Sequence, residues 1–336
     1  EPDFSRMNAF FGTSKFAEGA EMGTRQGDCS ICGKTGDPHL VSAYCKSWPW
    51  FLPTWTCPVS NSGDTKSIVE GIAIDETCYN DLNLGASYFG KIARPIDSLV
   101  TRELFSPVAD REGQRTVSHK SIGDLPTIYG AALLLPILEA TQMDESELRK
   151  FGERLTLRLD PQKNQGRLQQ HVETVLGFNG SVPRNVDDSV YRLNLLYYSG
   201  DPSRGDIHLR TTIEDVIPST LTKLVHLVQQ LAGDVPRLCE AVLPLASEKQ
   251  IAYHAGRMRF LPFVLARAYG GAYVWEQLQR LLRRKPLRSE RAIGNVARRI
   301  ASLVGRLPKT DYEIREEVLF YLFFFTFAYF LFGQLQ

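Results

Sequence analysis

The chain has 336 residues, of which 43% are hydrophobic and 23% are charged, and its formal net charge at pH 7 is +1. This composition is ordinary for a soluble globular protein with room for two or three domains. The first residues lack the basic start, short apolar core and small-residue cleavage site of a secretory signal, which argues against an exported, disulfide-rich protein.

Most of the cysteines lie near the N-terminus. Five of the six fall within the first 78 residues, and Cys239 stands alone in an apolar helical stretch, where we expect a buried thiol. In a chain without an export signal, such a cluster indicates a reducing cytosol and a metal site. The chain starts at Glu1 without a methionine and stops at Gln336 inside an apolar stretch, so we expect it to be part of a longer protein.

Residues 28–85 are rich in cysteine, tryptophan and proline, which is typical of a small loop-rich module held together by a metal. Within them, Cys29-Ser-Ile-Cys32-Gly33 has the form of a zinc knuckle. Two thiolates three residues apart can bind one tetrahedral ion, and the glycine lets the turn point backbone amides at the sulfurs. A closed site of this kind is structural and not catalytic.

The second half of this module departs from the pattern, because Asp75 stands where the first cysteine of a second pair ending at Cys78 would be. One interpretation is a site of three cysteines and Asp75, since carboxylate oxygen also binds zinc. In another, Cys45 or Cys57 supplies the fourth ligand. A third is a module that has lost its metal and is held by its packed tryptophans. The prediction carried forward is a structural Zn²⁺.

Two alternating runs, 188–198 and 207–213, flank a glycine- and proline-containing turn at 200–206, and together they predict a β-hairpin. Everything beyond Pro218 is predicted to be helical, with Ser219 capping the first helix. The predicted fold is therefore α+β, with a small zinc-knuckle-like module and a hairpin-containing N-terminal part followed by an all-helical bundle. The predicted domains are residues 1–115, 116–218 and 219–336.

Residues 280–309 hold ten basic residues and one acid, Glu290, so this segment carries +9 and the rest of the chain carries −8. On a helix, one side of this segment is apolar and the opposite side polar: Ile293, Val296, Ile300 and Leu303 against Arg291, Asn295 and Arg298. Such a helix can pack on a bundle and attract a phosphate backbone, an attraction that salt weakens. A solvated basic face is the alternative, and the scarcity of compensating acids favours nucleic acid.

Residues 318–332 form the most apolar stretch of the chain and are dominated by Phe and Tyr. These 15 residues fall short of the ~20 that a bilayer-spanning helix needs. We therefore expect either a fully buried helix or one that is covered by a partner or by missing residues.

Catalytic motifs are missing from the sequence, including the phosphate-binding glycine loop, HExxH, GxSxG and the zinc-deaminase signature. Asp187, Asp188 and Asp215 lie at turns or helix starts, where acids help to cap. We therefore predict that the protein is not an enzyme. The rival hypothesis is a metal-dependent nuclease that uses Asp187 or Asp188.

Several stretches together resemble the large subunit of type I-B CRISPR Cascade complexes. The knuckle at Cys29 followed by 75–85 is similar to that family's paired CxxC module, which runs into a helix. The strands at 193–198 and 207–209, followed by Ile-Glu-Asp-Val-Ile-Pro-Ser at 213–219, resemble a strand pair leading to an acidic helix start. Residues 274–303 resemble a late helix pair. The resemblance covers most of residues 29–336.

The resemblance implies a non-catalytic subunit of a crRNA-guided complex in the cytoplasm of a prokaryote, serving antiviral defence. Such a subunit inspects the short motif beside the target, assists duplex opening and R-loop formation, guides the displaced strand and offers a surface to a separate helicase-nuclease. Guide pairing reads the sequence itself. The expected partners are crRNA, target double-stranded DNA, the displaced strand, the other backbone and small subunits and the helicase-nuclease, with no membrane.

The resemblance also implies roles for individual residues. Cys29, Cys32 and Cys78 would hold the knuckle, with Asp75 as a fourth ligand. Lys91 and Arg94, just after the module, are expected DNA contacts. The residues expected to follow a strand backbone are Arg283, Arg284, Lys285, Arg288, Arg291 and Arg298. Two other functions stay open: a stand-alone zinc-knuckle DNA-binding protein, and the same subunit in a guided-transposition complex.

Overall fold

The structure is a computed structural model, and it describes residues 16–21, 23–43, 69, 71–104, 126–137, 169–179, 181–183, 186–201, 206–305 and 311–335. The chain divides into two compact units. The first comprises Glu1–Ile92 and Gly200–His208, and the second comprises Ala93–Ser199 and Leu209–Gln336. The three sequence-predicted domains stay a prediction.

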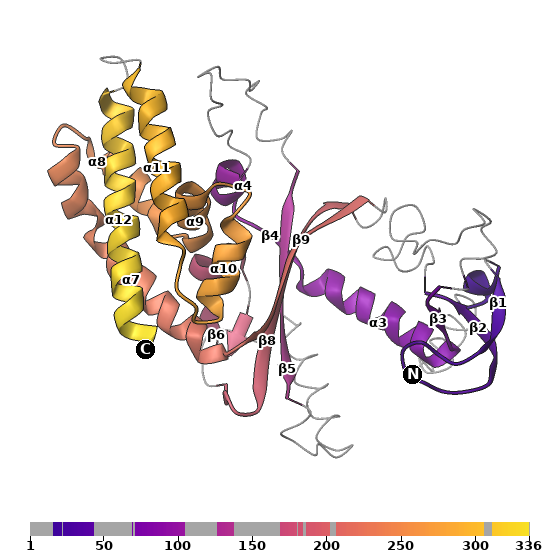
Figure 1. Ribbon diagram of the computed structural model, residues 1–336. Coiled ribbons are helices and arrows are strands. Elements are labelled where there is room, and N and C mark those ends of the chain that lie inside the picture. Colours follow the sequence, from indigo (N-terminus) through magenta and orange to yellow (C-terminus); the bar gives the residue numbers. More distant parts are fainter. Residues whose placement is uncertain are drawn as a thin grey trace, which may run out of the picture. The chain divides into compact units, whose positions relative to one another are not determined.

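The first unit is built on a small antiparallel sheet in the order β1-β2-β3, followed by one long helix (Figure 1). Its elements are β1 (Thr24–Gly27), β2 (Asp37–Ser42), β3 (Ala73–Ile74) and α3 (Glu76–Ile92). Leu40, Val41 and Ile74 are fully buried between the sheet and Tyr79 of α3. Only nine described residues form this core, and Cys29 and Cys78 are two of them.

The second unit begins with a four-stranded sheet in the order β4-β5-β8-β9. The strands are β4 (Arg94–Pro95), β5 (Ile128–Pro136), β8 (Tyr191–Asp201) and β9 (Asp206–Val216). β5 and β8 pair antiparallel along all nine residues of β5. β8 and β9 are neighbours in the sheet, so the predicted hairpin is confirmed. Short elements border the sheet: α4 (Ser98–Leu104), β6 (Gln169–His171), α6 (Glu173–Leu176) and β7 (Ser181–Pro183).

The remainder of the second unit is helical among the described residues, which confirms the α+β prediction. The helices are α7 (Pro218–Val242), α8 (Glu248–Met258), α9 (Leu261–Tyr269), α10 (Val274–Leu282), α11 (Ser289–Val304) and α12 (Asp311–Leu335). α12 packs along α7 and α11, and the buried α9 contacts α4, α8, α10, α11 and α12 (Figure 1). Cys239 is fully buried in α7, as predicted.

Sheet and helices of the second unit share one continuous core. Gly130 of β5 is required by this packing, since a Cβ at that position would lie 2.2 Å from the ring of Phe178. The Phe178 ring meets the Tyr197 ring edge-on, and the Tyr197 hydroxyl donates to the carbonyl of Leu176 at 3.0 Å. The sheet is thereby joined to the helical layer through aromatic side chains whose polar atoms are satisfied.

The predicted cap of the first long helix is wrong. α7 begins at Pro218, with Ile217 as its N-cap, so Ser219 already lies in the first turn. Proline suits this first position because it lacks an N–H that would be unsatisfied there. The Asp188 carboxylate accepts a hydrogen bond from the backbone N–H of Ser219 at 3.0 Å. The capping role predicted for Asp188 is therefore confirmed.

The apolar helix near the end, α12, is only partly buried. Leu319, Phe323 and Phe327 face the core, whereas Leu322 is 45% exposed and Tyr329 is 76% exposed. Full burial, one of the two predicted alternatives, is therefore wrong for the described residues. In the described part of the chain, no helix has the combination of length and apolar character needed to cross a membrane.

Candidate metal centre and basic segment

A tight turn after β1 brings Cys29 and Cys32 together. The backbone N–H of Gly33 donates to the carbonyl of Cys29 at 3.0 Å, and the N–H of Cys29 donates to the carbonyl of Lys34 at 2.9 Å. Gly33 has a φ of +72°, a left-handed conformation that glycine adopts without strain. Cys29 is buried and Cys32 is exposed. The glycine predicted from the knuckle motif therefore makes this turn.

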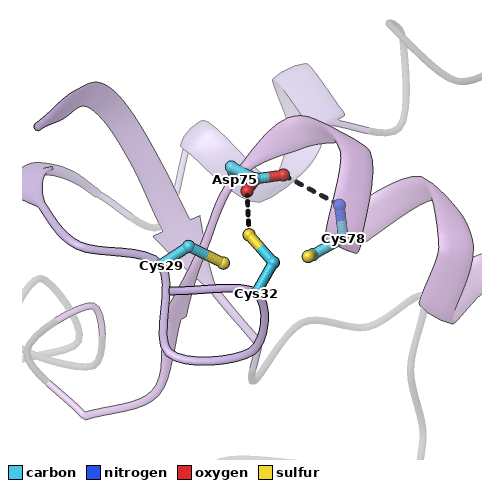
Figure 2. A group of neighbouring side chains, drawn as sticks. All are labelled: Cys29, Cys32, Asp75 and Cys78. Atoms are coloured by element: carbon cyan, nitrogen blue, oxygen red, sulfur yellow. Dashed lines mark hydrogen bonds between the residues drawn. The ribbon is translucent and has the colours of Figure 1, made fainter. Parts of the chain in front are cut away.

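The start of α3 supplies the other two members of the group. Asp75 directly precedes α3 and accepts a hydrogen bond from the backbone N–H of Cys78 on Oδ1 at 2.9 Å, which is the geometry of an N-cap. Its other oxygen, Oδ2, accepts from the Cys32 thiol at 3.0 Å. Figure 2 shows the four side chains pointing toward one another from the turn and from the helix start.

The protonation of the group follows from these contacts. Donation from Cys32, then from the backbone N–H of Cys78, lowers the pKa of Asp75 to about 2. Burial raises the pKa of Cys78 to about 12, and its two thiol neighbours contribute. The hydrogen bond to Asp75 raises the pKa of Cys32. Burial opposes ionisation of Cys29, but backbone amides directed at its sulfur, Cys32 first, lower the pKa of that thiol overall.

Cys29, Cys32, Asp75 and Cys78 form a group that can hold a metal ion, because their ligand atoms all lie within 4.8 Å of one another. Zinc–sulfur bonds of about 2.3 Å in a tetrahedron place sulfurs roughly 3.8 Å apart, so a contraction of about 1 Å at most completes a site. All four positions are filled by protein ligands, which is the arrangement of a structural site. Cys45 and Cys57 lie outside the described residues.

The two basic residues predicted after the module lie at the end of α3 and just beyond it. Lys91 is in the last turn of α3, and its side chain lies outside the described part of the structure. Arg94 lies in β4 and is exposed, with Nη1 donating to the carbonyl of Ala93 at 2.9 Å. The prediction that they contact DNA remains a prediction.

Part of the basic segment is neutralised by an acid that precedes it in the chain. Glu276 of α10 pairs with Arg291 of α11 at 2.5 Å and with Arg288 at 3.3 Å. The Arg291 guanidinium also stacks over the ring of Tyr273, with 4.3 Å from its carbon to the ring centroid. The compensating acid that the segment lacks in sequence is therefore provided by a neighbouring helix.

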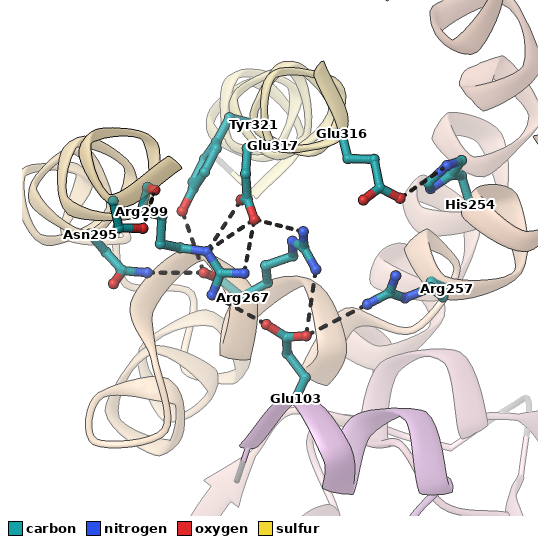
Figure 3. A network of polar contacts seen from close by, with 10 residues as sticks. Glu103, His254, Arg257, Arg267, Asn295, Arg299, Glu316, Glu317 and Tyr321 are labelled. Carbon is teal, nitrogen blue, oxygen red and sulfur yellow. Dashed lines mark hydrogen bonds and ion pairs between the residues drawn. The ribbon is translucent and has the colours of Figure 1, made fainter. Parts of the chain in front are cut away.

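A second part of the segment is buried in a network of charges (Figure 3). Arg299 of α11 binds Glu317 of α12 at 2.9 Å and reaches Glu103 of α4 at 3.4 Å. Arg267 of α9 binds the same two carboxylates, at 2.7 Å and 3.6 Å, and Arg257 of α8 lies 3.6 Å from Glu103. The network ties five elements together, so Arg299 has a structural role and is not available to nucleic acid.

The apolar stripe predicted for α11 is only partly buried: Leu303 is buried and Val296 packs against the core, but two positions are reversed. Ile293, predicted to face the bundle, is 56% exposed, whereas Asn295, predicted to face solvent, is 2% exposed. The Asn295 amide donates to the carbonyls of Arg267 and Ala268 at the end of α9, both at 3.0 Å. The last carbonyls of a helix have no partner within it. Satisfying them outweighs the burial of one isoleucine.

Four of the predicted nucleic-acid residues have no carboxylate partner among the described residues: Arg283, Arg284, Lys285 and Arg298. Arg298 is exposed, and its Nε donates to a carbonyl of its own helix, that of Gly294. The other three are consecutive and lie where the chain leaves α10. Of the nucleic-acid contacts predicted in the basic segment, those without a carboxylate partner among the described residues are therefore Arg298 by itself and a group of three consecutive residues.

The acids of the rival nuclease hypothesis are engaged locally. Asp187 accepts from the backbone N–H and the hydroxyl of Ser189 at 2.8 Å and 2.6 Å, and these hydrogen bonds lower its pKa. The Asp188 carboxylate accepts from the backbone N–H of Ser219 in the first turn of α7, as described above. Comparisons with protein families, curated proteins and solved structures find no match for this chain.

The sequence prediction missed the carboxylates that neutralise the basic segment. Glu103 and Glu317 are far apart in the chain and meet at Arg299 only in the folded structure, whereas Glu276 pairs separately with Arg288 and Arg291. One signal was present, since Glu316 and Glu317 stand at the edge of the most apolar stretch. An acid in that position is either at a helix end or buried with a partner, because an isolated buried carboxylate is costly.

Proposed function

We propose that this chain is the non-catalytic large subunit of a crRNA-guided type I-B Cascade complex and that its knuckle holds a structural Zn²⁺. One observation carries the proposal. The four positions that the family resemblance assigns to a paired ligand module converge into a group that can hold a metal ion, although 43 positions separate Cys32 from Asp75.

Zinc suits the donor set. Three thiolates and one carboxylate oxygen are all zinc ligands, and Zn²⁺ accepts a tetrahedral arrangement without a geometric preference of its own. Ca²⁺ and Mg²⁺ prefer oxygen ligands throughout. The bound ion would hold the turn after β1 against the start of α3, and with four protein ligands it has no position for a substrate.

In this role the subunit works in the cytoplasm of a prokaryote. It inspects the motif beside the target, assists duplex opening and R-loop formation and helps to recruit the helicase-nuclease, while the guide RNA reads the sequence. Exposed cations without ion pairs support a contact with a phosphate backbone. Arg283 and Lys285 fit this requirement best.

The test is a co-purification. The protein is tagged in its native operon and recovered, and its bound proteins and RNA are identified. Recovery of a repeat-bearing guide RNA with several backbone subunits supports the proposal. Recovery of the chain alone and free of RNA contradicts it. The neighbouring genes separate defence from guided transposition, because one requires a helicase-nuclease and the other a transposase.

A stand-alone DNA-binding protein is the second candidate function. The observation that favours it is that one chain carries both a group that can hold a metal ion and the exposed cations Arg283 and Lys285. Specific, tight binding of DNA by the isolated chain would favour this candidate, whereas a Cascade subunit needs its guide RNA and its partners for tight specific binding.

A further inference from the structure

The three consecutive cations between α10 and α11 form a loop that is held rigidly; we call Arg283, Arg284 and Lys285 the cationic loop. The backbone N–H of Arg284 donates to the carbonyl of Leu281 at 3.0 Å, and that of Lys285 donates to the carbonyl of Arg280 at 2.7 Å. The Arg280 side chain donates back to the carbonyl of Pro286 at 2.7 Å. The loop is therefore closed by hydrogen bonds on both sides.

Arg284 adopts an unusual conformation at the centre of this loop. Its φ is +54°, in the left-handed region, which costs a non-glycine residue about 1–2 kcal/mol. Its side chain compensates by donating from Nε to the Thr220 hydroxyl at 2.8 Å and from Nη2 to the Ser219 hydroxyl at 3.0 Å. The loop is thus fastened to the first turn of α7. Strain of this kind persists where the surroundings hold it, and it is often found at binding sites.

The neighbours on either side of Arg284 are exposed, and neither forms an ion pair with another described residue. Arg283 donates from Nε to the carbonyl of Glu214 at 3.2 Å, and its two Nη groups make no hydrogen bond among the described residues. Lys285 is exposed, and its Nζ has no partner in the described structure. Two nearby acids are engaged, Asp215 by Arg192 at 3.0 Å and Asp188 by the start of α7.

The positive charge of the cationic loop is therefore in excess over its surroundings, even counting the exposed Glu214. Its unused donors are planar guanidinium N–H groups and one ammonium, which are the donors that bind phosphate oxygens. A phosphodiester backbone satisfies them without the base contacts that reading a sequence would need. By contrast, the guanidinium groups of Arg288 and Arg291 are paired with the Glu276 carboxylate.

We propose that the cationic loop is a binding site for the phosphate backbone of DNA, in which Arg283 and Lys285 contact phosphates and Arg284 is a positioning residue that fastens the loop to α7. This inference rests on the proposed function, because it assigns the target-DNA contact of that subunit to one loop. It also removes Arg288 and Arg291 from the contact and gives them the structural role of joining α11 to α10.

The experiment compares Arg283→Gln/Lys285→Gln with Arg237→Gln/Lys249→Gln, which removes the same charge from exposed positions on α7 and α8. Arg237 lies 19 residues beyond Pro218, or about 28 Å along α7 at 1.5 Å per residue. Each variant is prepared in the form recovered from the native operon, as a complex or as the full chain. Binding to a fluorescent DNA duplex and to an RNA duplex of the same sequence is measured across a range of salt concentrations.

Each phosphate contact adds about 0.9 to the steepness of the fall of log K with log salt. Loss of two contacts therefore makes this dependence shallower by about 2. We expect this change, with about a 10-fold or greater loss of DNA affinity at low salt, in the loop variant and not in the control. Equal losses in both variants, no loss in either, a loss confined to RNA, or no measurable DNA binding by the wild type would overturn the inference. The proposed function fails separately, by the absence of guide RNA and partner subunits.

The positioning role has its own readout. Arg284→Lys keeps the charge but cannot make both directed hydrogen bonds, so we expect weaker DNA binding with an unchanged salt slope. Ser219→Ala removes one of the two acceptors without touching the loop and should act in the same direction. Thermal melting identifies any variant that does not fold. Wild-type affinity in both variants would overturn the positioning role and leave the contact residues to be judged by the first comparison.

Discussion

The Cys32 thiol donates a hydrogen bond to Oδ2 of Asp75 at 3.0 Å, although the two residues are 43 positions apart in the chain. Oδ1 of the same carboxylate caps α3 through the N–H of Cys78 at 2.9 Å. A metal replacing the thiol proton would take Oδ2 and leave the cap intact. Asp75 is thus placed to serve as a helix cap and as a single-oxygen ligand at the same time, and substitutions can separate the two functions.

We predict that Asp75→Asn and Asp75→Cys have opposite effects on metal affinity. Asparagine is an equally good N-cap but carries no charge, so α3 stays intact and zinc affinity falls about 10-fold or more. Cysteine supplies a fourth thiolate and keeps or raises the affinity, while losing the cap lowers the stability of the metal-free protein by about 1 kcal/mol. Competition with a chromogenic chelator measures the affinities. Wild-type affinity in Asp75→Asn would assign the fourth ligand elsewhere.

Metal removal is predicted to loosen the first unit and spare the second. The described core of the first unit has nine residues, two of which are the ligands Cys29 and Cys78, so little apolar burial remains without the ion. Chelation, or Cys78→Ser, should make residues 24–92 sensitive to protease while the helices from α7 onward stay protected. Cys239→Ala, at a thiol buried in α7, is the control and should keep one equivalent of zinc. Equal protection with and without chelator would contradict a structural role for the metal.

The buried charge network is predicted to be sensitive to loss of one member. Glu317→Ala leaves Arg267 and Arg299 with only the more distant Glu103 carboxylate, at 3.6 Å and 3.4 Å, in a site that is about four-fifths buried or more. Breaking a buried pair on one side costs about 3–5 kcal/mol. Arg298→Ala changes an exposed residue of α11, next to Arg299, and should alter the free energy of unfolding by less than about 0.5 kcal/mol. Urea unfolding compares the two, and similar midpoints would show that the network contributes nothing.

Stability is predicted to fall as the pH falls from about 7 to 5, through His254. Burial lowers the pKa of His254, and the charges of Arg257 and Arg267 lower it further. The unfolded chain therefore takes up a proton near pH 6.5 that the folded chain binds only at lower pH. Glu316, 3.4 Å away, has a pKa that burial raises, and its protonation acts in the opposite sense. The melting temperature of His254→Gln should depend less on pH across this window than that of the wild type. An equal dependence in both proteins would contradict the assignment to His254.

The features that could be predicted from the sequence are those formed by residues close together in the chain. The spacing of Cys29, Cys32 and Gly33 specifies a turn by itself, and that turn is present. Alternation of polar and apolar residues likewise specified the β8–β9 hairpin. The spacing of Asp75 and Cys78 suggested that they join this turn, but Cys45 and Cys57 stayed open as ligands, because no local pattern relates positions 43 residues apart.

Two of the predictions that were wrong had treated polar residues as solvent-facing. Periodicity assigned Asn295 to the outside of α11, but an amide that satisfies two carbonyls at a helix end is stable inside. The charge count of the basic segment was misleading for the same reason, since Arg299 and Arg291 find carboxylates on other helices. A tally of charges along the chain carries no information on long-range pairing.

The orientation of α11 yields the last prediction, on a pair of neighbouring positions. Ile293→Lys places a charge where the side chain is already exposed and should change the free energy of unfolding by less than about 0.5 kcal/mol. Asn295→Leu, at a buried position, removes the amide donor of the Ala268 carbonyl and leaves the Arg267 carbonyl with the Tyr321 hydroxyl alone, at 3.5 Å; it should cost about 1–3 kcal/mol. A helix oriented by its apolar stripe would give the reverse order, with the lysine variant strongly destabilised. Urea unfolding of the two variants decides between the orientations. The sign of the difference between their free energies of unfolding is sufficient, whatever its size.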